Sequence, residues 1–364
     1  MTPVSGPRCF LHMPKCAGSS VRQALIHSLP PGAVSPKVEE GLFWMVDWDP
    51  DAIGPQWRQQ MVLDDDDVQE LAGYEVVIGH FSLPLLHRIT APSLVATVLR
   101  EPRARLLSNY AYWRVASENP TWQGWSLADF AWRPLDEFLG SPLVAGETDN
   151  VICRMLVGGD ERVPLHGLIA PGDVSGVASR AIEALDSLGF VGLVELGDSM
   201  WKGLSAFFDV DVTPTTVNTI DQWRSVSAAP GIDLAITPQT LELLEARTAA
   251  DSIVYRHALA AAGCASDAER IADAAFANEL SRVGNNIGTS VNVLRERVAE
   301  NEELRQQLDA RDAALRRAEE DLTRHRAWLD GIQGSASWRL TAPVRAAKHR
   351  LQNIATEVRP PAEG

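Results

Sequence analysis

Short and almost continuous apolar runs alternate with helical patterns along the first three quarters of the chain. The apolar runs, which are typical of parallel strands buried on both faces, lie at residues 9–13, 74–79, 93–99 and 190–194. The helical patterns lie at residues 21–28, 104–114, 174–188, 198–208, 238–262 and 266–283. This alternation predicts an α/β fold with a doubly wound parallel sheet flanked by helices. Residues 30–73 are predicted to be rich in loops, and the carboxylate run Asp64–Asp67 to be a solvated loop rather than a metal site.

The chain changes character after residue 283. Residues 284–290, Gly-Asn-Asn-Ile-Gly-Thr-Ser, have the composition of a linker. Residues 291–330 form a long charged helical pattern with leucines on one heptad line, at 294, 308, 315, 322 and 329. The partner positions of this heptad are charged, so a homodimeric coiled coil and a solvated single helix both remain open. Residues 331–364 form a basic, partly amphipathic tail, for which contact with an acidic membrane surface, docking on a partner and packing as a terminal helix remain open.

Charge and cysteine usage narrow the class of protein. The formal net charge of −15 argues against non-specific binding to nucleic acid, which depends on lysines and arginines that neutralise phosphates. The four cysteines are scattered without paired spacing, which argues against a disulfide framework or a zinc site. Nothing near Met1 resembles a signal peptide, and no apolar run reaches the roughly 18–20 residues of a membrane span. We therefore expect a cytoplasmic protein.

Residues 10–20, Phe-Leu-His-Met-Pro-Lys-Cys-Ala-Gly-Ser-Ser, predict an anion-binding turn between the first strand and the first helix. Gly18, Ser19 and Ser20 open the helix, where backbone N–H groups and the helix dipole favour an anion. Lys15 adds a full positive charge. In an ATP-binding P-loop the lysine follows the second glycine, whereas Lys15 precedes Gly18 by three residues. The turn therefore predicts a P-loop-like sheet with a phosphate-bearing ligand, and argues against an ordinary kinase or ATPase.

Polar side chains follow three of the predicted strands, with Lys15 after the first, His80 after the second and Arg100 after the third. The carboxyl ends of such strands line the ligand crevice, so these groups should meet. Ser108 lies eight residues after Arg100, about two helical turns, and the fork of an arginine suits a remote phosphate. A neutral histidine can take a proton from an attacking hydroxyl. Carboxylates that would hold magnesium are missing at these strand ends, which favours transfer of a less charged group, such as a sulfuryl, without a metal.

Together these motifs resemble the carbohydrate sulfotransferases that use 3′-phosphoadenosine 5′-phosphosulfate (PAPS). The resemblance rests on His12-Met-Pro-Lys-Cys-Ala-Gly-Ser-Ser20, Gly79-His80-Phe-Ser and Leu99-Arg100-Glu-Pro-Arg-Ala-Arg-Leu-Leu-Ser108-Asn-Tyr110. It continues weakly through residues 149–156, 190–195 and 251–255, and so covers about residues 7–262. We therefore divide the chain into a sulfotransferase domain at 1–283, a linker at 284–290, a charged helix at 291–330 and a tail at 331–364.

The resemblance implies a role for each motif residue. Those that hold the 5′-phosphosulfate of PAPS are Lys15, Cys16, Ala17, Gly18, Ser19 and Ser20. Arg100 and Ser108 hold the 3′-phosphate, His80 is the general base, and Lys15 assists departure of adenosine 3′,5′-bisphosphate; no metal is required. The implied acceptor is a hydroxyl of a glycan, a glycolipid or a related molecule. Cys16 and Ser19 stand where threonine is common in the family, and Cys16 is expected to make the site sensitive to thiol reagents.

The segment Ser335-Ala-Ser-Trp-Arg-Leu-Thr-Ala-Pro resembles, more weakly, the tails of bacterial glycan-building enzymes. It suggests a bacterial cytoplasmic enzyme, with membrane association through the tail as an open alternative. Two other functions stay open: a kinase of P-loop type, and an inactive nucleotide-binding scaffold in glycan assembly. The tryptophans at 113, 122, 125 and 132 suit an acceptor cleft or the packing of a long loop. Asp149, Asn150 and Arg154 either bind the acceptor or hold polar roles inside the fold, and His12 is expected to be structural.

Overall fold

The computed structural model describes residues 6–40, 61–62, 64–116, 130–131, 133–165, 167–214 and 237–348. Its sheet has the strand order β3-β2-β4-β1-β5-β6, and every neighbouring pair is parallel. The strands are β1 (Arg8–Leu11), β2 (Val38–Glu40), β3 (Met61–Val62), β4 (Val76–His80), β5 (Val95–Leu99) and β6 (Phe190–Leu193). β1 thus lies between β4 and β5. The predicted α/β architecture, a parallel sheet flanked by helices, is confirmed.

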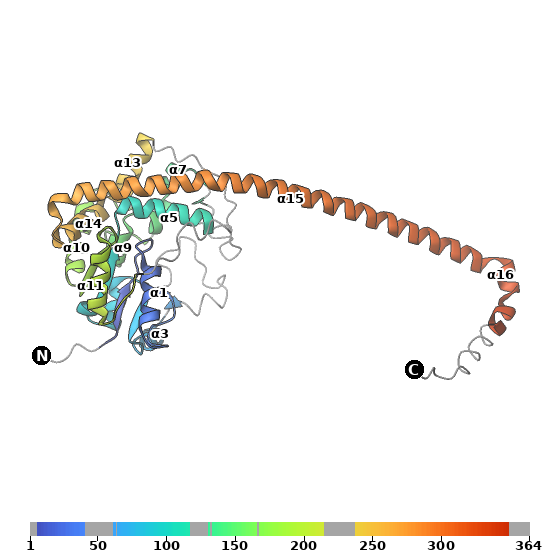
Figure 1. Ribbon diagram of the computed structural model, residues 1–364, viewed down its shortest axis with the longest axis horizontal. Coiled ribbons are helices and arrows are strands. Elements are labelled where there is room, and N and C mark those ends of the chain that lie inside the picture. The colour runs from blue at the N-terminus through green and yellow to red at the C-terminus, as the bar shows by residue number, and fades with distance from the viewer. Residues whose placement is uncertain are drawn as a thin grey trace. The chain divides into compact units, whose positions relative to one another are not determined.

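Helices cover both faces of the sheet (Figure 1). Successive side chains of a strand point to opposite faces, so Cys9 and Leu11 of β1 join one core cluster and Phe10 joins the other. The first cluster includes residues of α4 (Leu83–Ile89), α9 (Val151–Leu156), α10 (Val174–Asp186) and α14 (Ala249–Ala261). The second includes residues of α1 (Gly18–Ser28) and α11 (Asp198–Phe208). Burial on both faces explains why these strands are continuous apolar runs in the sequence.

The described helices agree with most of the predicted ranges. They are α1 (Gly18–Ser28), α3 (Asp65–Leu71), α4 (Leu83–Ile89), α5 (Pro102–Ala116), α7 (Leu135–Gly140), α8 (Ala145–Thr148), α9 (Val151–Leu156), α10 (Val174–Asp186), α11 (Asp198–Phe208), α13 (Pro238–Arg247), α14 (Ala249–Ala261), α15 (Ala268–Gly334) and α16 (Ala336–Leu340). The predicted helix 238–262 is broken into α13 and α14 at Thr248. Within the described ranges, no helix combines the length and apolar character that a membrane span requires.

The stretch 30–73 holds more regular structure than its sequence predicts. β2, β3 and α3 lie within it. β2 was not predicted because it is too short and too acidic to form an apolar run. Asp64–Asp67 is the start of α3 rather than a solvated loop, so that prediction is wrong. Oδ1 of Asp64 accepts the backbone N–H groups of Asp66 and Asp67 at 3.0 Å each, and Asp67 returns a contact to the backbone of Asp64. This capping box, with carboxylates at the positive end of the helix dipole, explains the run.

Residues 284–290, predicted to be a linker, are helical and continue α15 without interruption. Glycine in a helix interior costs only about 1 kcal/mol, and the long helical flanks on both sides outweigh this. The chain divides into two compact units, Met1–Leu294 and Arg295–Gly364. Residues 268–294 of α15 therefore belong to the same unit as the sheet.

The first part of α15 runs alongside α5 (Figure 1). Val283 of α15 is buried in a third core cluster with Leu106, Leu107 and Tyr110 of α5, to which α7 and α13 also contribute. Arg103 of α5 donates to Asp273 of α15 at 3.1 Å. Because α5 starts directly after β5, this packing brings α15 to the edge of the sheet where the candidate site lies.

Candidate functional site

Three neighbouring strands end at one edge of the sheet, and the predicted site residues follow them. His12 and Lys15 follow β1, His80 ends β4, and Arg100 follows β5. The rings of His12 and His80 lie with their centroids 4.3 Å apart, and Nη1 of Arg100 donates to the carbonyl oxygen of Lys15 at 3.3 Å. The loop after β1 thus contacts His80 through His12 and Arg100 through the backbone of Lys15.

The turn between β1 and α1 has a strained backbone. Lys15 and Ala17 adopt positive φ angles of 64° and 61°, a conformation uncommon for residues other than glycine. Left-handed residues alternating with right-handed ones aim backbone N–H groups at one point, which forms an anion-binding nest. The N–H groups of the first turn of α1, which begins at Gly18, have the same orientation toward the loop. The strain therefore lies where the sequence predicts the phosphate cradle.

Position 18 requires a glycine because the His12 ring packs closely against its backbone. A Cβ atom added at Gly18 would lie 1.7 Å from Cδ2 of the His12 ring. The ring would have to move, and with it the contact to His80.

We expect Gly18→Ala to lower the free energy of unfolding by about 1–3 kcal/mol, the usual cost of overpacking, and to weaken binding of the phosphate-bearing ligand that the sequence predicts. Urea unfolding and titration calorimetry measure the two effects. Gly140→Ala is the matched control, because no atom lies within 4 Å of a Cβ added there. Equal behaviour of the two variants would contradict the packing role of Gly18.

Lys15 is surrounded by other cations and by an aromatic face. Its Nζ lies 4.2 Å from the centroid of the Tyr112 ring. Burial, together with the charges of Arg100 and Arg282, lowers the pKa of Lys15 to about 7. A lysine held this way favours an anionic ligand, because the ligand's charge offsets both the burial and the repulsion.

His80 is oriented by a carboxylate of the neighbouring strand. Nδ1 of His80 lies 3.4 Å from Oε1 of Glu39 on β2, and Nζ of Lys37 lies 2.9 Å from the same oxygen. Burial would raise the pKa of Glu39, but the hydrogen bond from His80 and the charge of Lys37 lower it, so Glu39 is ionised. An ionised carboxylate accepts only, so the proton of the neutral imidazole lies on Nδ1 and Nε2 is the basic nitrogen. Burial lowers the pKa of His80, which keeps the ring neutral near pH 7.

Arg100 and Ser108 are linked through α15. Nη2 of Arg100 donates to Oε2 of Glu279 at 2.7 Å, and Nε of Arg282 donates to the same oxygen at 2.7 Å. Nη2 of Arg282 also reaches Oγ of Ser108 at 3.4 Å. The predicted pair thus lies in one cluster with a carboxylate and a second guanidinium.

The sequence did not identify several residues that lie at or near the predicted site residues. Glu39 and Lys37 lie in a stretch predicted to be loop-rich, and Glu279 and Arg282 lie on a helix whose packing partner the sequence does not reveal. Glu147 is another: its Oε2 accepts Nδ2 of Asn109 at 2.9 Å, and burial raises its pKa to about 7. The only signal available was the three-residue spacing of Glu279 and Arg282, which is common in helices.

Comparisons with known proteins do not assign the chain. No family model matches it, and no curated protein matches its sequence. The site must therefore be interpreted from its own residues.

Cys16 is a packing residue within the turn. It is buried, its Sγ lies 3.6 Å from the carbonyl oxygen of Pro14, and burial raises its pKa to about 12. The thiolate is the reactive form of cysteine, so this thiol is inert at neutral pH. The expectation that Cys16 makes the site sensitive to thiol reagents is therefore not supported by its surroundings.

Asp149, Asn150 and Arg154 belong to a network inside the fold. Nη2 of Arg154 donates to Oδ2 of Asp149 at 2.7 Å, and both side chains are almost fully buried. Arg154 also donates to the carbonyl oxygens of Pro164 and Gly167. Oδ1 of Asn150 accepts the backbone N–H of Ala250 at 2.8 Å. Of the two roles left open by the sequence, these contacts favour the structural one.

We expect Arg154→Ala to lower the free energy of unfolding by about 3 kcal/mol, because it removes the nearer of two guanidiniums that pair with the buried Asp149 carboxylate and leaves only Arg247 at 3.9 Å. Urea unfolding followed by tryptophan fluorescence measures this. Arg180→Ala, which removes an exposed pair with Glu183, should change stability by no more than about 0.5 kcal/mol. At urea concentrations below the unfolding transition, both variants should keep the same affinity for the phosphate-bearing ligand that the sequence predicts. A loss of that affinity in Arg154→Ala alone would indicate a role in binding.

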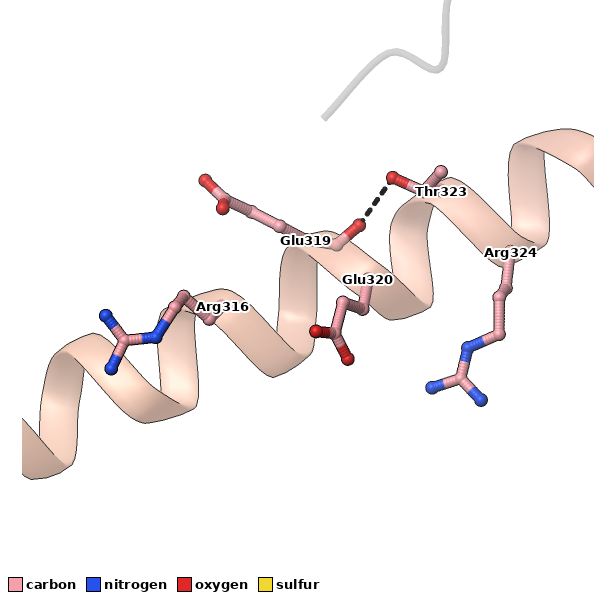
Figure 2. Close-up of a pocket in the computed structure, with 5 residues that line it drawn as sticks. All are labelled: Arg316, Glu319, Glu320, Thr323 and Arg324. Atoms are coloured by element: carbon pink, nitrogen blue, oxygen red, sulfur yellow. Dashed lines mark hydrogen bonds between the residues drawn. The ribbon is translucent and has the colours of Figure 1, made fainter.

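The remaining aromatic and surface candidates add nothing to the site. Trp113 is buried in the core cluster of α5, and Trp122, Trp125 and Trp132 lie outside the described residues. No group of three or more His, Cys, Asp and Glu side chains suited to a metal ion occurs in the part of the chain that the structure describes. A surface hollow on α15 is lined by charged residues and Thr323, whose Oγ1 donates to the carbonyl oxygen of Glu319 (Figure 2). Its lining comes from one helix alone, so no second wall is available to enclose a ligand.

Proposed function

We propose that this chain is a PAPS-dependent sulfotransferase, with a P-loop-like sheet, that moves a sulfuryl group to a hydroxyl of a glycan, a glycolipid or a related acceptor. One observation carries the proposal. The same sheet edge brings together a lysine-bearing anion cradle, an imidazole oriented by a carboxylate, and a separate arginine cluster around Ser108. A donor with a reacting 5′-phosphosulfate and a remote 3′-phosphate needs these three elements.

The residues fit such a donor by charge and by hydrogen-bonding type. The 5′-phosphosulfate would be held by the backbone N–H groups of residues 17–20 and by Nζ of Lys15, whereas the backbone N–H of Cys16 donates to the carbonyl oxygen of Met13 at 3.2 Å. The 3′-phosphate would be held by Arg100 and Ser108, since a guanidinium can grip two phosphate oxygens at once. The donor supplies the sulfuryl group, and the chain supplies binding, orientation and proton transfer.

His80 and Lys15 would perform the two proton-linked tasks. Nε2 of His80 takes the proton of the acceptor hydroxyl as its oxygen bonds to sulfur, and Glu39 stabilises the imidazolium that forms. Lys15, in its protonated form, donates to the bridging oxygen that departs with adenosine 3′,5′-bisphosphate. Cationic and imidazole groups, rather than a pair of carboxylates, stand at these strand ends, so we propose a reaction without a required metal.

Nucleotide selectivity tests the donor class. In a thermal-shift experiment, adenosine 3′,5′-bisphosphate should raise the melting temperature more than adenosine 5′-phosphate does, with no dependence on magnesium. ATP that stabilises the chain more than the bisphosphate, and only with magnesium, would contradict the proposal and favour the kinase. A bisphosphate-binding chain that transfers no labelled sulfuryl group to any of a broad panel of acceptors would favour the scaffold.

Partners other than the acceptor belong to the same proposal. Leu315, Leu322 and Leu329 of α15 are 60 %, 53 % and 47 % exposed in the single chain, which supports a homodimer through residues 291–330. Peripheral membrane contact through the basic tail at 331–364 and a cytoplasmic location are proposed from composition alone. The acidic net charge supports a function without nucleic acid.

A further inference from the structure

A buried carboxylate on α15 lies between two guanidinium groups at the site. Glu279 is only 2 % exposed, and one of its oxygens accepts from both Arg100 and Arg282 at 2.7 Å. Arg100 comes from the end of β5, whereas Arg282 comes from α15, so the cluster joins segments far apart in the sequence. Residues 268–294 of α15 lie in the same compact unit as the sheet.

The carboxylate holds the two guanidiniums together. Two arginines at close range repel each other, and an anion between them offsets that repulsion. Burial would raise the pKa of Glu279, but its hydrogen bond to Arg282 and the charges of Arg100 and Arg282 lower it, so the carboxylate is ionised. Glu279 is therefore a positioning residue for both arginines.

Arg282 faces the residues assigned to the second phosphate. Its Nη2 lies 3.4 Å from Oγ of Ser108, and its charge acts on Lys15 together with that of Arg100. Its side chain is 36 % exposed, so it is accessible to solvent, unlike that of Glu279. A phosphate dianion is gripped best by more than one cation, and a guanidinium offers it paired donors.

We infer that Arg282 of α15 is a ligand of the nucleotide's 3′-phosphate, so that the subsite consists of Arg100, Ser108 and Arg282, with Glu279 holding the two arginines in place. The inference rests on the proposed function, because it concerns the same donor. It makes α15 part of the binding site rather than only an appendage, and it makes recognition of the 3′-phosphate depend on the helix that carries the C-terminal region.

The test compares two ligands that differ only in the 3′-phosphate. Titration calorimetry on the full chain would give the dissociation constants of adenosine 3′,5′-bisphosphate and of adenosine 5′-phosphate. Arg282→Ala should weaken the bisphosphate roughly 10- to 100-fold, the effect of losing one hydrogen-bonded charge, and should leave the monophosphate within about twofold. Arg282→Lys, which keeps the charge but loses the fork, should give an intermediate value.

Arg270→Ala is the matched control. Arg270 is also on α15 and makes the same kind of pair with an acidic residue three positions earlier, Asp267, at 2.9 Å. In the described part of the chain, Arg100 bonds to Lys15 and Glu279, and Ser108 bonds to Arg282, so neither bonds to Arg270. Both dissociation constants should be unchanged in this variant.

Three outcomes would overturn the inference. If Arg100→Ala lowers the preference for the bisphosphate and Arg282→Ala does not, Arg282 is no ligand, although the proposed function stands. If Arg282→Ala weakens both ligands equally and lowers the melting temperature more than Arg270→Ala does, its role is structural. If the wild-type chain shows no preference for the bisphosphate, the inference and the proposed function fail together.

Discussion

His80→Ala should lower turnover with a true acceptor by roughly 10²–10⁴-fold, the usual contribution of a general base. The expectation follows from the arrangement around the ring. Glu39 accepts the Nδ1 proton, so Nε2 is left as the basic nitrogen, and burial keeps the ring neutral near pH 7. Transfer of labelled sulfate measures turnover. Affinity for adenosine 3′,5′-bisphosphate should change little, because His80 is not assigned to either phosphate.

The pH profile distinguishes His80 from the other titratable candidate, Glu147. A base must be deprotonated to act, so kcat/KM falls as the pH drops below the pKa of the base. The pKa of His80 lies below its ordinary value of 6.5, whereas burial raises that of Glu147 to about 7. An acid limb below pH 6.5 that is lost in His80→Ala supports the assignment. Unchanged turnover in His80→Ala, with a large loss in Glu147→Gln, would transfer the role to Glu147.

The elements that carry the chemistry could be predicted because their signals are local. β1, β4 and β5 are apolar runs, each followed directly by its functional residue, and parallel strands bring those residues to one edge. The loop at residues 12–18 could be identified from its glycine, lysine and small residues. Its strained φ angles at Lys15 and Ala17 could not, because nothing in an alanine or a lysine indicates a left-handed conformation.

The partners of these residues could not be predicted, because they depend on tertiary contacts. Glu39 becomes a hydrogen-bond partner of His80 only because β2 pairs with β4 in the register Glu39↔His80. β2 itself is short and acidic, so no periodicity marks it. Arg282 lies in a helical pattern with many charged residues, and the sequence does not show whether these residues face solvent or a neighbouring helix. The continuity of α15 through residues 284–290 was missed for a different reason. The two glycines in this short stretch suggest a break, but the long helical segments on both sides outweigh their cost.

Lys15→Met should lower kcat/KM by roughly 10²–10³-fold, the usual effect of removing one donor that stabilises charge on a leaving group. Methionine keeps a long apolar side chain against the Tyr112 ring and removes only the charge, so stability should change less than it would with alanine. Adenosine 5′-phosphate should also bind more weakly, since Lys15 is assigned to the 5′ end. Calorimetry and sulfate transfer on the same preparation measure both effects. Full activity in Lys15→Met would remove Lys15 from the cradle.

The pH dependence of binding gives an independent test of the same lysine. With its pKa at about 7, Lys15 is protonated below that pH and loses its charge above it, so affinity for adenosine 5′-phosphate should fall from pH 7 to 9, at most roughly tenfold per pH unit. Three acidic groups around it do not titrate there, because the pKa of Glu279 is lowered and burial raises the pKa of both Cys16 and Tyr112 to about 12. Lys15→Arg, which cannot lose its proton, should bind the ligand with a flat profile over this range. A slope that persists in Lys15→Arg would locate the titrating group elsewhere and contradict the assignment.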